Sequence, residues 1–308
     1  MNPKSILAVG SIALDTLETP LGKRRDILGG SATFFAVAAS LFAPVNLIGV
    51  VGTDFPEEGW QLLSDRGVDL SDVQRVDGKT FRWGARYSSD LNHRETLFTD
   101  LGVFENFQPK VSEKNRKADL VYLGNIQPSL QLAVCSELPP GSTIIADTMN
   151  LWIDVNREEL RRVVQKSDIF LLNDEEAVQF TGQTDLEDAA DSLLRAGPTT
   201  VIIKQGQNGA LLATENSRRH IPVYPGAKVV DPTGAGDSFA GGLLGQLAQQ
   251  TESTMEEAVI MAAATASYTV EGLGLEGLLK ATQEGIRRRA GAISQRMDER
   301  AIQQGLRL

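Results

Sequence analysis

The sequence predicts an α/β fold, with a mostly parallel central sheet flanked by helices and a small second sheet. Short apolar, β-branched segments alternate with segments of helical character along most of the 308 residues. This alternation is typical of parallel strands covered by helices on both faces of a sheet. The length suits one large α/β domain with an accessory piece, so we expect a single domain over residues 1–308.

The strands expected in the central sheet are short apolar runs: Ile6–Val9, Val45–Val50, Asp119–Leu123, Thr143–Ala146, Asp168–Leu172 and Thr200–Lys204. The helices expected between them are Ser31–Leu41, Pro56–Arg66, Ser129–Glu137, Val155–Gln165, Glu175–Phe180 and Leu186–Arg195. Ligands of such sheets bind beyond the carboxyl ends of the strands. Small and polar residues at or just past those ends therefore place the candidate site on one edge: Gly10, Gly49, Gly124, Asp147, Asn173 and Gly206.

Two segments, Ser11–Leu28 and Arg75–Leu101, interrupt this alternation. They lack helical periodicity and carry alternating polar and aromatic residues. Within the second segment, Thr80–Tyr87 and Glu95–Thr99 have the pattern of strands around a polar turn, Ser88–His93. We expect the two segments to form the small sheet outside the main domain.

Charge and composition narrow the functional classes. Forty acidic and thirty basic side chains give a formal net charge of −10, which argues against nucleic-acid binding because that function needs a basic surface. A phosphate ligand stays compatible, since a pocket is built locally and bound magnesium brings its own charge. The single cysteine, Cys135, permits no internal disulfide and favours a reducing compartment.

The N-terminal apolar run is too short for a signal peptide, and no segment approaches the roughly 20 apolar residues of a membrane span. We therefore expect a cytoplasmic protein with no membrane partner. The chain beyond Leu278 has helical composition, and its run Arg287–Arg289 is interpreted as a solvated face.

The most informative segment is Asp231–Gly242, with the sequence DPTGAGDSFAGG. Gly234, Ala235 and Gly236 cannot shield their own backbone, and a helix is expected after them, so their N–H groups form an anion site at a helix N-terminus. A carboxylate beside such a site would repel a bound anion, so anion binding alone does not explain its presence. A catalytic role does. Asp237 fits a general base that takes a proton from a hydroxyl while the amides hold the phosphoryl group under attack. The alternative is that Asp237 only caps the helix.

This segment resembles the Asp-Thr-x-Gly-Ala-Gly-Asp signature of the ribokinase (PfkB) family of carbohydrate and nucleoside kinases, with Pro232 where Thr is commoner. The resemblance runs from Gly10 to about Gly274. It implies a ribokinase-like fold and ATP-dependent phosphorylation of a hydroxyl on a small sugar, with Asp237 as general base and the Gly-Ala-Gly amides as anion hole. It also implies that the small sheet is a lid over the substrate and a surface for a homodimer.

The resemblance assigns two further turns to the nucleotide. The sequence NDEE follows an apolar strand and matches an Asn-x-x-Glu motif, so Asn173 and Glu176 would bind the phosphates and Mg2+, partly through water. The same residues match a capping box, so a purely structural role is the alternative. Gly206 and Gly209 match a Gly-x-x-Gly turn that contacts ATP, with Lys204 as a phosphate contact, although a Gly-rich turn between strands can simply be a hairpin.

The acceptor site implied by the resemblance lies near the N-terminus. Asp15 matches an Asp that binds substrate hydroxyls, since a carboxylate accepts several O–H bonds; a surface charge is the alternative. Gly29 and Gly30 match a Gly-Gly signature whose backbone approaches the sugar. Phe34 departs from the Asn that sugar kinases often place nearby, although its ring could lie against a substrate ring. Asp147–Trp152 resembles the Asp-Pro-Asn-x-Arg segment of fructokinase-like members only loosely and lacks its Arg.

These departures leave the acceptor open. A nucleoside kinase is the alternative within the family, and Phe34 with the aromatic side chains of Phe81, Trp83 and Tyr87 would suit one. A non-catalytic sugar or nucleotide sensor on the same fold would be expected to have lost Asp237 or the glycines, all of which are present.

The sequence also indicates which metal sites to expect other than the magnesium site. As in some family members, Asp231 would help to build a monovalent-cation (K+) site with Glu271–Gly274. His93 and His220 lack ligand-spaced partners, so no zinc site is indicated. The glycines near the N-terminus do not form a G-x-G-x-x-G motif, which leaves a dinucleotide-dependent oxidoreductase without support.

Overall fold

The computed structural model describes residues 3–89, 91, 94–249 and 253–303. At its centre is a nine-stranded sheet in the order β13-β12-β11-β10-β9-β8-β1-β4-β5. Neighbouring strands from β11 through to β5 pair in parallel, and the pairs β11–β12 and β12–β13 at one edge are antiparallel. The strands are β1 (Ile6–Val9), β4 (Val45–Gly52), β5 (Val68–Val76), β8 (Leu120–Leu123), β9 (Thr143–Ala146), β10 (Ile169–Asn173), β11 (Thr200–Lys204), β12 (Ala210–Thr214) and β13 (Ser217–Ile221).

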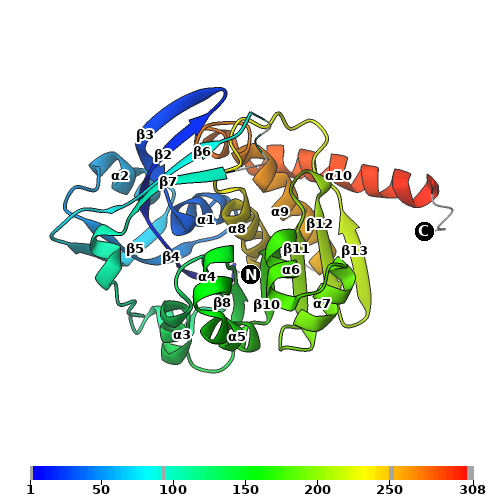
Figure 1. Ribbon diagram of the computed structural model, residues 1–308, viewed down its shortest axis with the longest axis horizontal. Helices are drawn as coiled ribbons and strands as arrows, with labels where there is room; N and C mark the ends of the chain where they lie inside the picture. The colour runs from blue at the N-terminus through cyan, green and yellow to red at the C-terminus, as the bar shows by residue number, and fades with distance from the viewer. Residues whose placement is uncertain (1–2, 90, 92–93, 250–252, 304–308) are drawn as a thin grey trace.

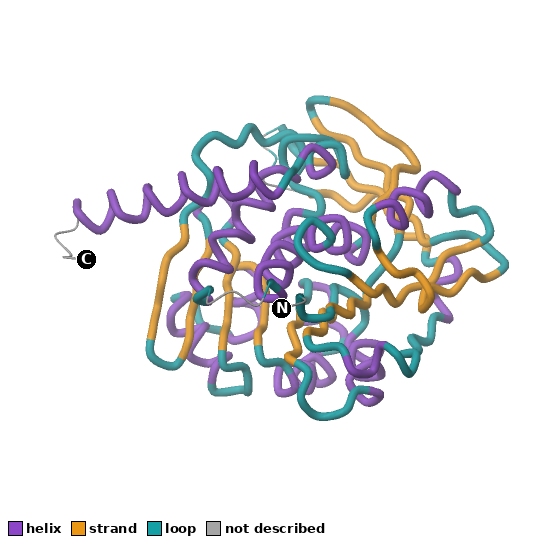
Figure 2. The backbone as a smooth tube through the Cα atoms, turned by 180° about the vertical axis from the view of Figure 1, so that it is seen from behind, coloured by secondary structure: helices purple, strands orange, loops and turns teal. Residues whose placement is uncertain are grey.

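Helices cover both faces of this sheet (Figure 1). One face packs against α1 (Ser31–Ala39), α2 (Glu57–Asp65), α8 (Ala235–Ala248), α9 (Met255–Thr269) and α10 (Gln283–Gln303). The other packs against α3 (Pro128–Glu137), α4 (Asn150–Val155), α5 (Arg157–Lys166), α6 (Asp174–Thr181) and α7 (Leu186–Leu194). The far end of α10 extends away from the body of the protein (Figure 2).

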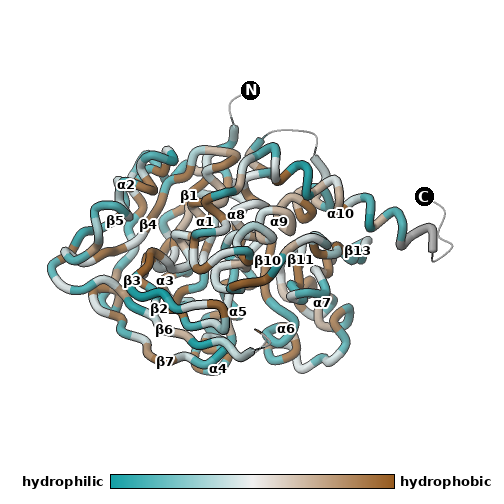
Figure 3. Tube along the Cα trace, turned by 90° about the horizontal axis from the view of Figure 1, so that it is seen from above, coloured by the Kyte–Doolittle hydropathy of each residue, from teal (hydrophilic) through white to brown (hydrophobic). Residues whose placement is uncertain are grey.

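The alternation of side chains along each strand explains why both faces are covered. In β10, Ile169 and Leu171 belong to one hydrophobic cluster, whereas Phe170 and Leu172 belong to the other. Strands buried on both faces read as continuous apolar runs, as β10 and β11 do in Figure 3. The predicted mostly parallel sheet flanked by helices is confirmed.

Helix α8 lies unusually close to its two neighbours, α1 and α9. A Cβ added at Gly241 would lie 2.6 Å from the Phe35 carbonyl oxygen of α1, and one at Gly242 would lie 2.6 Å from Thr265 Oγ1 of α9. No side chain fits at either position without a backbone shift. The middle of α8 is therefore held by close contact on two sides.

A small second sheet, in the order β3-β2-β6-β7, lies beside the main one (Figure 1). Its strands are β2 (Ala13–Thr19), β3 (Gly22–Gly29), β6 (Phe81–Tyr87) and β7 (Arg94–Asp100). The β2–β6 pair is parallel and the other two pairs are antiparallel. The predicted small second sheet is confirmed.

Some of the expected boundaries differ from those in the structure. Arg75 and Val76 belong to β5 of the main sheet, because that strand extends further than its apolar residues indicate. Gly49 lies inside β4, which runs on to Gly52. His93 and part of the predicted turn around it lie outside the described residues.

Two single observations complete the fold. Within the described residues, no helix is both long and apolar enough to span a lipid bilayer. Cys135 lies partly buried on α3, and burial raises the pKa of its thiol to about 11, as expected for an inert core cysteine.

Candidate active site

The carboxyl ends of β8, β9, β10 and β11 meet the N-terminal end of α8 at one edge of the main sheet. Tyr122 of β8 reaches Asp237 of α8, with 3.4 Å between the phenol oxygen and Asp237 Oδ1. Asp147 directly follows β9, and its carboxylate accepts from the ammonium group of Lys204, the last residue of β11. Of the residues predicted for this edge, all but Gly49 lie at or just past strand ends: Gly10, Gly124, Asp147, Asn173 and Gly206.

The turn before α8, Asp231–Gly236, is named the anion turn below. Gly234 is the N-cap of α8 and has φ 75°, a left-handed conformation that favours glycine. A Cβ added there would overlap the ring of Phe34, which is 1% exposed. Phe34, expected at the substrate, thus lies beneath the turn and supports it, so its ring is not open to a substrate in this conformation.

Asp237 is the third residue of α8 and not its N-cap, so the capping alternative is wrong. The first N–H groups of a helix have no partner inside the helix, which is why the turn suits an anion. Among the three predicted amides, the Ala235 N–H donates to the Pro232 carbonyl at 3.2 Å. It is therefore a weaker candidate for an anion contact than the amides of Gly234 and Gly236.

The environment of Asp237 suits a proton acceptor. Burial raises the pKa of Asp237 to about 7; the nearby Asp147 carboxylate adds to the rise, and Lys204 and the Tyr122 hydroxyl oppose it. Tyr122 is fully buried and stacks on Phe35, with 4.1 Å between ring centroids. Burial, then the charges of Asp237 and Asp147, raise the pKa of Tyr122 well above its usual value. The phenol therefore stays protonated and donates a hydrogen bond to Asp237 Oδ1.

Lys204 and Asp147 form a buried ion pair, with 2.8 Å between Nζ and Asp147 Oδ2. Burial opposes the charged form of Lys204, but Asp147 and Glu176 outweigh that effect, and the pKa of Lys204 is raised. A Cβ added at Gly236 would lie 3.1 Å from Lys204 Nζ. The structure thus places a fixed positive charge beside the anion turn, where a phosphate contact was expected.

Asn173 and Glu176 form the capping box of α6. Asn173 Oδ1 accepts from the Glu176 N–H at 2.7 Å, and Glu176 Oε2 accepts from the Asn173 N–H at 2.7 Å. Glu176 is 5% exposed, and burial raises its pKa to about 7, opposed by Lys204 and reinforced by Asp147. The structural role is therefore present, and binding of magnesium would be additional to it.

Gly206 and Gly209 lie in the connection between the antiparallel strands β11 and β12, so the turn is a hairpin, as the structural alternative expected. Both have positive φ, 53° and 97°, and a Cβ at Gly209 would overlap the Ile221 carbonyl oxygen. The turn begins directly after Lys204 and is therefore on the same edge as the ion pair.

Asp15 is buried in β2, 3% exposed, next to Gly29 and Gly30. A Cβ at Gly29 would overlap the Asp15 carboxylate, and Gly30 has φ 91°. Burial raises the pKa of Asp15 to about 8; the Gly30 N–H opposes the rise, and the charges of Asp231 and Asp237 add to it. Asp15 and the two glycines are thus together, on the Asp237 side of the small sheet.

Asp231 holds the anion turn from inside. It is 0% exposed; its Oδ1 accepts from the Thr233 N–H at 2.9 Å, and its Oδ2 accepts from the Gly274 N–H at 2.8 Å. Burial raises the pKa of Asp231 against these two hydrogen bonds. In the part of the chain that the structure describes, no group of three His, Cys, Asp or Glu side chains could hold a metal ion. The monovalent-cation site at Asp231 stays a prediction.

Sequence reasoning missed contacts made by two tyrosines. Tyr122 is one of them. The other is Tyr87 of β6, whose hydroxyl lies 2.8 Å from Thr233 Oγ1 and so joins the small sheet to the anion turn. Neither residue belongs to a local motif, and only the tertiary fold brings them to the site.

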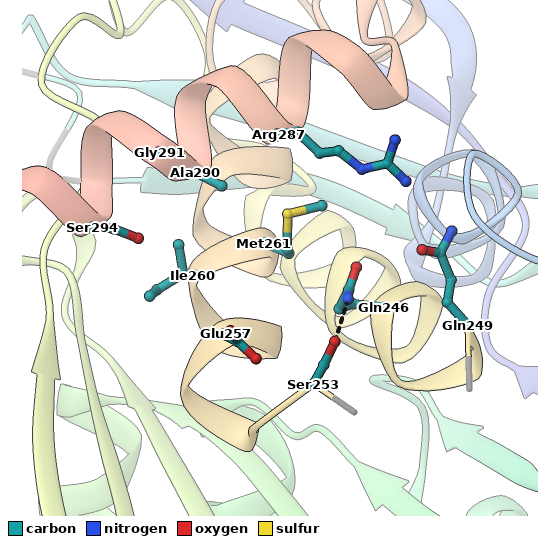
Figure 4. Close-up of a pocket in the computed structure, with 10 residues that line it drawn as sticks. All are labelled: Gln246, Gln249, Ser253, Glu257, Ile260, Met261, Arg287, Ala290, Gly291 and Ser294. Atoms are coloured by element: carbon teal, nitrogen blue, oxygen red, sulfur yellow. Dashed lines mark hydrogen bonds between the residues drawn. The ribbon is translucent and has the colours of Figure 1, made fainter. Parts of the chain in front are cut away.

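Two surface hollows lie elsewhere. One, of about 310 Å³, lies among α8, α9 and α10 and is lined by the side chains labelled in Figure 4. Its lining includes Gln246 of α8, which lies nine residues from Asp237 along the same helix, or roughly 13 Å at 1.5 Å per residue. The other, of about 320 Å³, lies between β3, α2 and Leu273–Leu279. Neither includes the ion pair or Asp237.

Comparisons with known proteins show what the chain is similar to. The family model for pfkB family carbohydrate kinases matches residues 9–281. A cytidine kinase from Thermococcus kodakarensis is 33% identical over 246 residues, which cover 78% of this chain and 87% of the relative. A nucleoside kinase from Methanocaldococcus jannaschii is 23% identical over 287 residues, which cover 89% and 92%.

Solved structures share the fold. A nucleoside kinase from Burkholderia thailandensis in complex with inosine superposes with a TM-score of 0.81 at 21% identity and covers 94% of this chain and 98% of that one. A protein from E. coli assigned as a ribokinase II, in complex with ATP and Mg2+, has a TM-score of 0.78 at 20% identity, with 94% and 99% covered. Because the family model spans most of the chain and the Thermococcus relative shares 33% identity across most of its length, this chain is a kinase that belongs to the pfkB family of carbohydrate kinases.

Proposed function

We propose that the protein transfers the γ-phosphoryl group of Mg-ATP to a hydroxyl on the ribose of a nucleoside. The observation that carries the transfer chemistry is Asp237, half-buried at the N-terminal end of α8, with its pKa raised to about 7 and the Tyr122 hydroxyl as donor. A base whose pKa lies near the working pH is the efficient choice for removing a hydroxyl proton.

Asp237 takes the proton of the acceptor hydroxyl as the oxygen attacks the γ-phosphorus, and the bond from this phosphorus to the β–γ bridging oxygen breaks, so that ADP leaves. The amides of the anion turn, those of Gly234 and Gly236 above all, stabilise the charge that spreads over the phosphoryl oxygens. Lys204, fixed by Asp147, adds a positive charge next to Gly236. The turn needs no rearrangement to do this, because Asp231 and Phe34 already hold it.

ATP and Mg2+ would bind at the ends of β10 and β11. The residues fit these ligands: Glu176 offers a carboxylate oxygen beside Asn173, and Gly206 and Gly209 offer a turn without side chains. Magnesium prefers such oxygen ligands and keeps several waters, so one protein carboxylate is sufficient. When bound, Mg2+ neutralises part of the triphosphate charge.

The acceptor would lie between Asp15 and Asp237, under the small sheet acting as a lid. In the β2–β6 pair, Asp15 and Trp83 are direct neighbours, so the indole and the carboxylate share one face of that sheet. A carboxylate suits ribose hydroxyls and an aromatic ring suits a planar base. This pairing, with the cytidine and nucleoside kinases among the relatives, favours a nucleoside over the free sugar that the sequence alone suggested.

A phosphorylation screen tests the acceptor class. Cytidine, inosine, adenosine, ribose and fructose are each incubated with Mg-ATP, and the phosphorylated product is identified by mass spectrometry. Asp237→Asn, purified in parallel, controls for contaminating kinases. Product from nucleosides with little from free sugars is expected. Product formed only from ribose or fructose, and from none of the nucleosides, would mean that the acceptor is a free sugar.

Glu176→Gln should raise the magnesium concentration needed for half-maximal activity by about tenfold or more, the effect of roughly 1.4 kcal/mol. The reason is that the variant loses the carboxylate charge but keeps an oxygen for the Asn173 N–H, so the capping box survives. Magnesium titration and thermal melting are measured side by side, with the exposed neighbour Glu175→Gln as control. An unchanged magnesium requirement would leave Glu176 with the capping role alone.

Trp83 fluorescence should change when the true acceptor binds and respond little to ATP alone. The indole neighbours Asp15 and carries the Arg94 guanidinium 5.2 Å from its ring centroid, so closure over an acceptor would alter its surroundings. Closure of this kind excludes water from the reaction. The measurement needs a background of Trp60→Phe and Trp152→Phe. A signal that follows ATP but no phosphorylated acceptor would remove the lid role from the small sheet.

A further inference from the structure

The anion turn is connected to the segment that follows α9. Asp231 accepts from the Gly274 N–H at 2.8 Å, and the Val270 carbonyl accepts from the Val230 N–H at 2.7 Å. The Asp231 N–H donates to the same Val270 carbonyl at 3.3 Å, so three hydrogen bonds join the start of the turn to the segment Val270–Gly277. The position of this segment therefore sets the position of the Asp231 carboxylate and, through the Thr233 N–H, of the turn itself.

The segment has little freedom of its own. Gly274 has φ 57°, and a Cβ there would lie 2.5 Å from Ile27 Cδ1 of β3. A Cβ at Gly272 would overlap the Gly277 nitrogen, and Glu276 pairs with Arg24 of β3 at 3.0 Å. The segment is thus packed against the small sheet on one side and bonded to the anion turn on the other.

Arg289 of α10 contacts the segment through Glu271, in addition to the contacts with the small sheet and the anion turn. Its guanidinium donates to Glu271 Oε2 at 2.7 Å and to Ser267 Oγ at 2.9 Å. It lies 3.6 Å from the ring centroid of Tyr268 and 4.6 Å from that of Tyr224. The side chain is 14% exposed, so the interpretation of Arg287–Arg289 as one solvated face is wrong for Arg289.

These contacts are stronger than a surface ion pair. Arg288, one residue earlier on α10, is 75% exposed and pairs with Glu284 one turn away, an arrangement that contributes little. Arg289 instead combines a charge-assisted hydrogen bond with two aromatic faces in a site mostly shielded from water. Of these two arginines, Arg289 contacts the segment that is hydrogen-bonded to the anion turn, through Glu271, whereas Arg288 contacts only Glu284 of its own helix.

We propose that Arg289 is a positioning residue for the anion turn. By holding Glu271 it fixes the Gly274 N–H against Asp231, and through Asp231 it fixes the amides of Gly234 and Gly236. Its effect on catalysis rests on the proposed role of those amides in phosphoryl transfer, whereas its effect on the geometry of the turn does not.

Amide hydrogen exchange in the ligand-free protein tests the geometric part. Arg289→Met, Glu271→Gln and the double variant are compared with the wild type, and Arg288→Met is the matched control. Exchange in peptides covering residues 230–236 should be about threefold to thirtyfold faster in the first three and unchanged in the control. The double variant should match the single ones, because Arg289 and Glu271 act as one unit.

Kinetics test the catalytic part, with any acceptor that is turned over. kcat should fall by a similar factor while KM for ATP changes little, and Arg289→Lys should recover part of the loss, since it keeps the charge but loses the planar stacking. Faster exchange confined to residues 267–271 and α10 would overturn the proposal. Faster exchange at 230–236 with unchanged kcat would support the connection and overturn the role of the amides instead.

Discussion

Asp237→Asn is expected to lower kcat by roughly 10²–10⁴, the contribution of a positioned general base. The amide keeps the volume of the carboxylate and can still accept from the Tyr122 hydroxyl, so the fold and ATP binding should be retained. Turnover and ATP affinity are measured on the same preparation. A variant that keeps more than about a tenth of wild-type activity would remove Asp237 from the role of base.

The pH profile makes this prediction sharper. Asp237 acts only when deprotonated and its pKa is about 7, so wild-type kcat/KM should fall as pH drops below about 7. The residual activity of Asp237→Asn should lack the part of this fall that comes from Asp237, whereas Asp15 and Glu176, with pKa values raised to about 8 and about 7, still titrate in this range. Tyr122→Phe is the matched control: it removes a hydrogen bond that lowers the pKa of Asp237, so the fall should move to higher pH.

The same pKa predicts an effect on stability. A carboxyl group with a pKa raised on folding stabilises the folded state at low pH, and that contribution is lost as pH rises through about 7. Asp237→Asn removes this loss. Its melting temperature at pH 8 should therefore equal or exceed that of the wild type, while its activity is far lower. A melting temperature well below the wild-type value would mean that Asp237 has a structural role.

Gly236→Val should lower kcat by about 10²–10³, comparable with the loss of one donor to a developing oxyanion. The residue lies beside Lys204 Nζ, 3.1 Å from the position of a Cβ, and a β-branched side chain there would displace the ammonium and crowd the phosphoryl group. Steady-state kinetics with saturating Mg-ATP measures the effect.

Gly236→Ala is the matched control for that variant. A single methyl meets only the mobile end of the Lys204 side chain, so a small shift accommodates it and the loss should be much smaller. Gly236 has no positive φ, so neither variant strains the backbone. Equal rates for the folded Val variant and the wild type would show that the amide of Gly236 does not hold the transferring group.

The fold was largely predictable because its strands are buried on both faces. Short, almost fully apolar runs such as Ile6–Val9 and Thr200–Lys204 are typical of buried parallel strands, and both are strands of the main sheet. The expected helix Val155–Gln165 corresponds to α5, which begins two residues later, at Arg157, because the chain turns at Asn156 with φ −133° and ψ 35°. The short helix α4 before this turn was not expected. A local break of this kind depends on contacts of Asn156 that periodicity does not report.

The site was predictable where a motif is local and unpredictable where a contact is distant. Asp237 and its glycines follow one another in the chain. Tyr122 lies 115 residues before Asp237, and Tyr87 lies 146 residues before Thr233, so only the assembled sheets bring them together. The same holds for the burial of Phe34, because nothing near it in the sequence indicates that it packs under Gly234.

The close contacts of α8 restrict how this protein could be made more stable. Replacing a glycine inside a helix with alanine often stabilises a protein, since each such glycine costs about 0.5–1 kcal/mol. At Gly241 and Gly242 that route is closed, because the new methyl group would meet the Phe35 carbonyl oxygen and Thr265. The helix that carries the proposed base must therefore keep a weak intrinsic preference for helix and depend on its neighbours for its shape. A core substitution in α1 or α9 is then able to impair turnover without touching any residue of the active site.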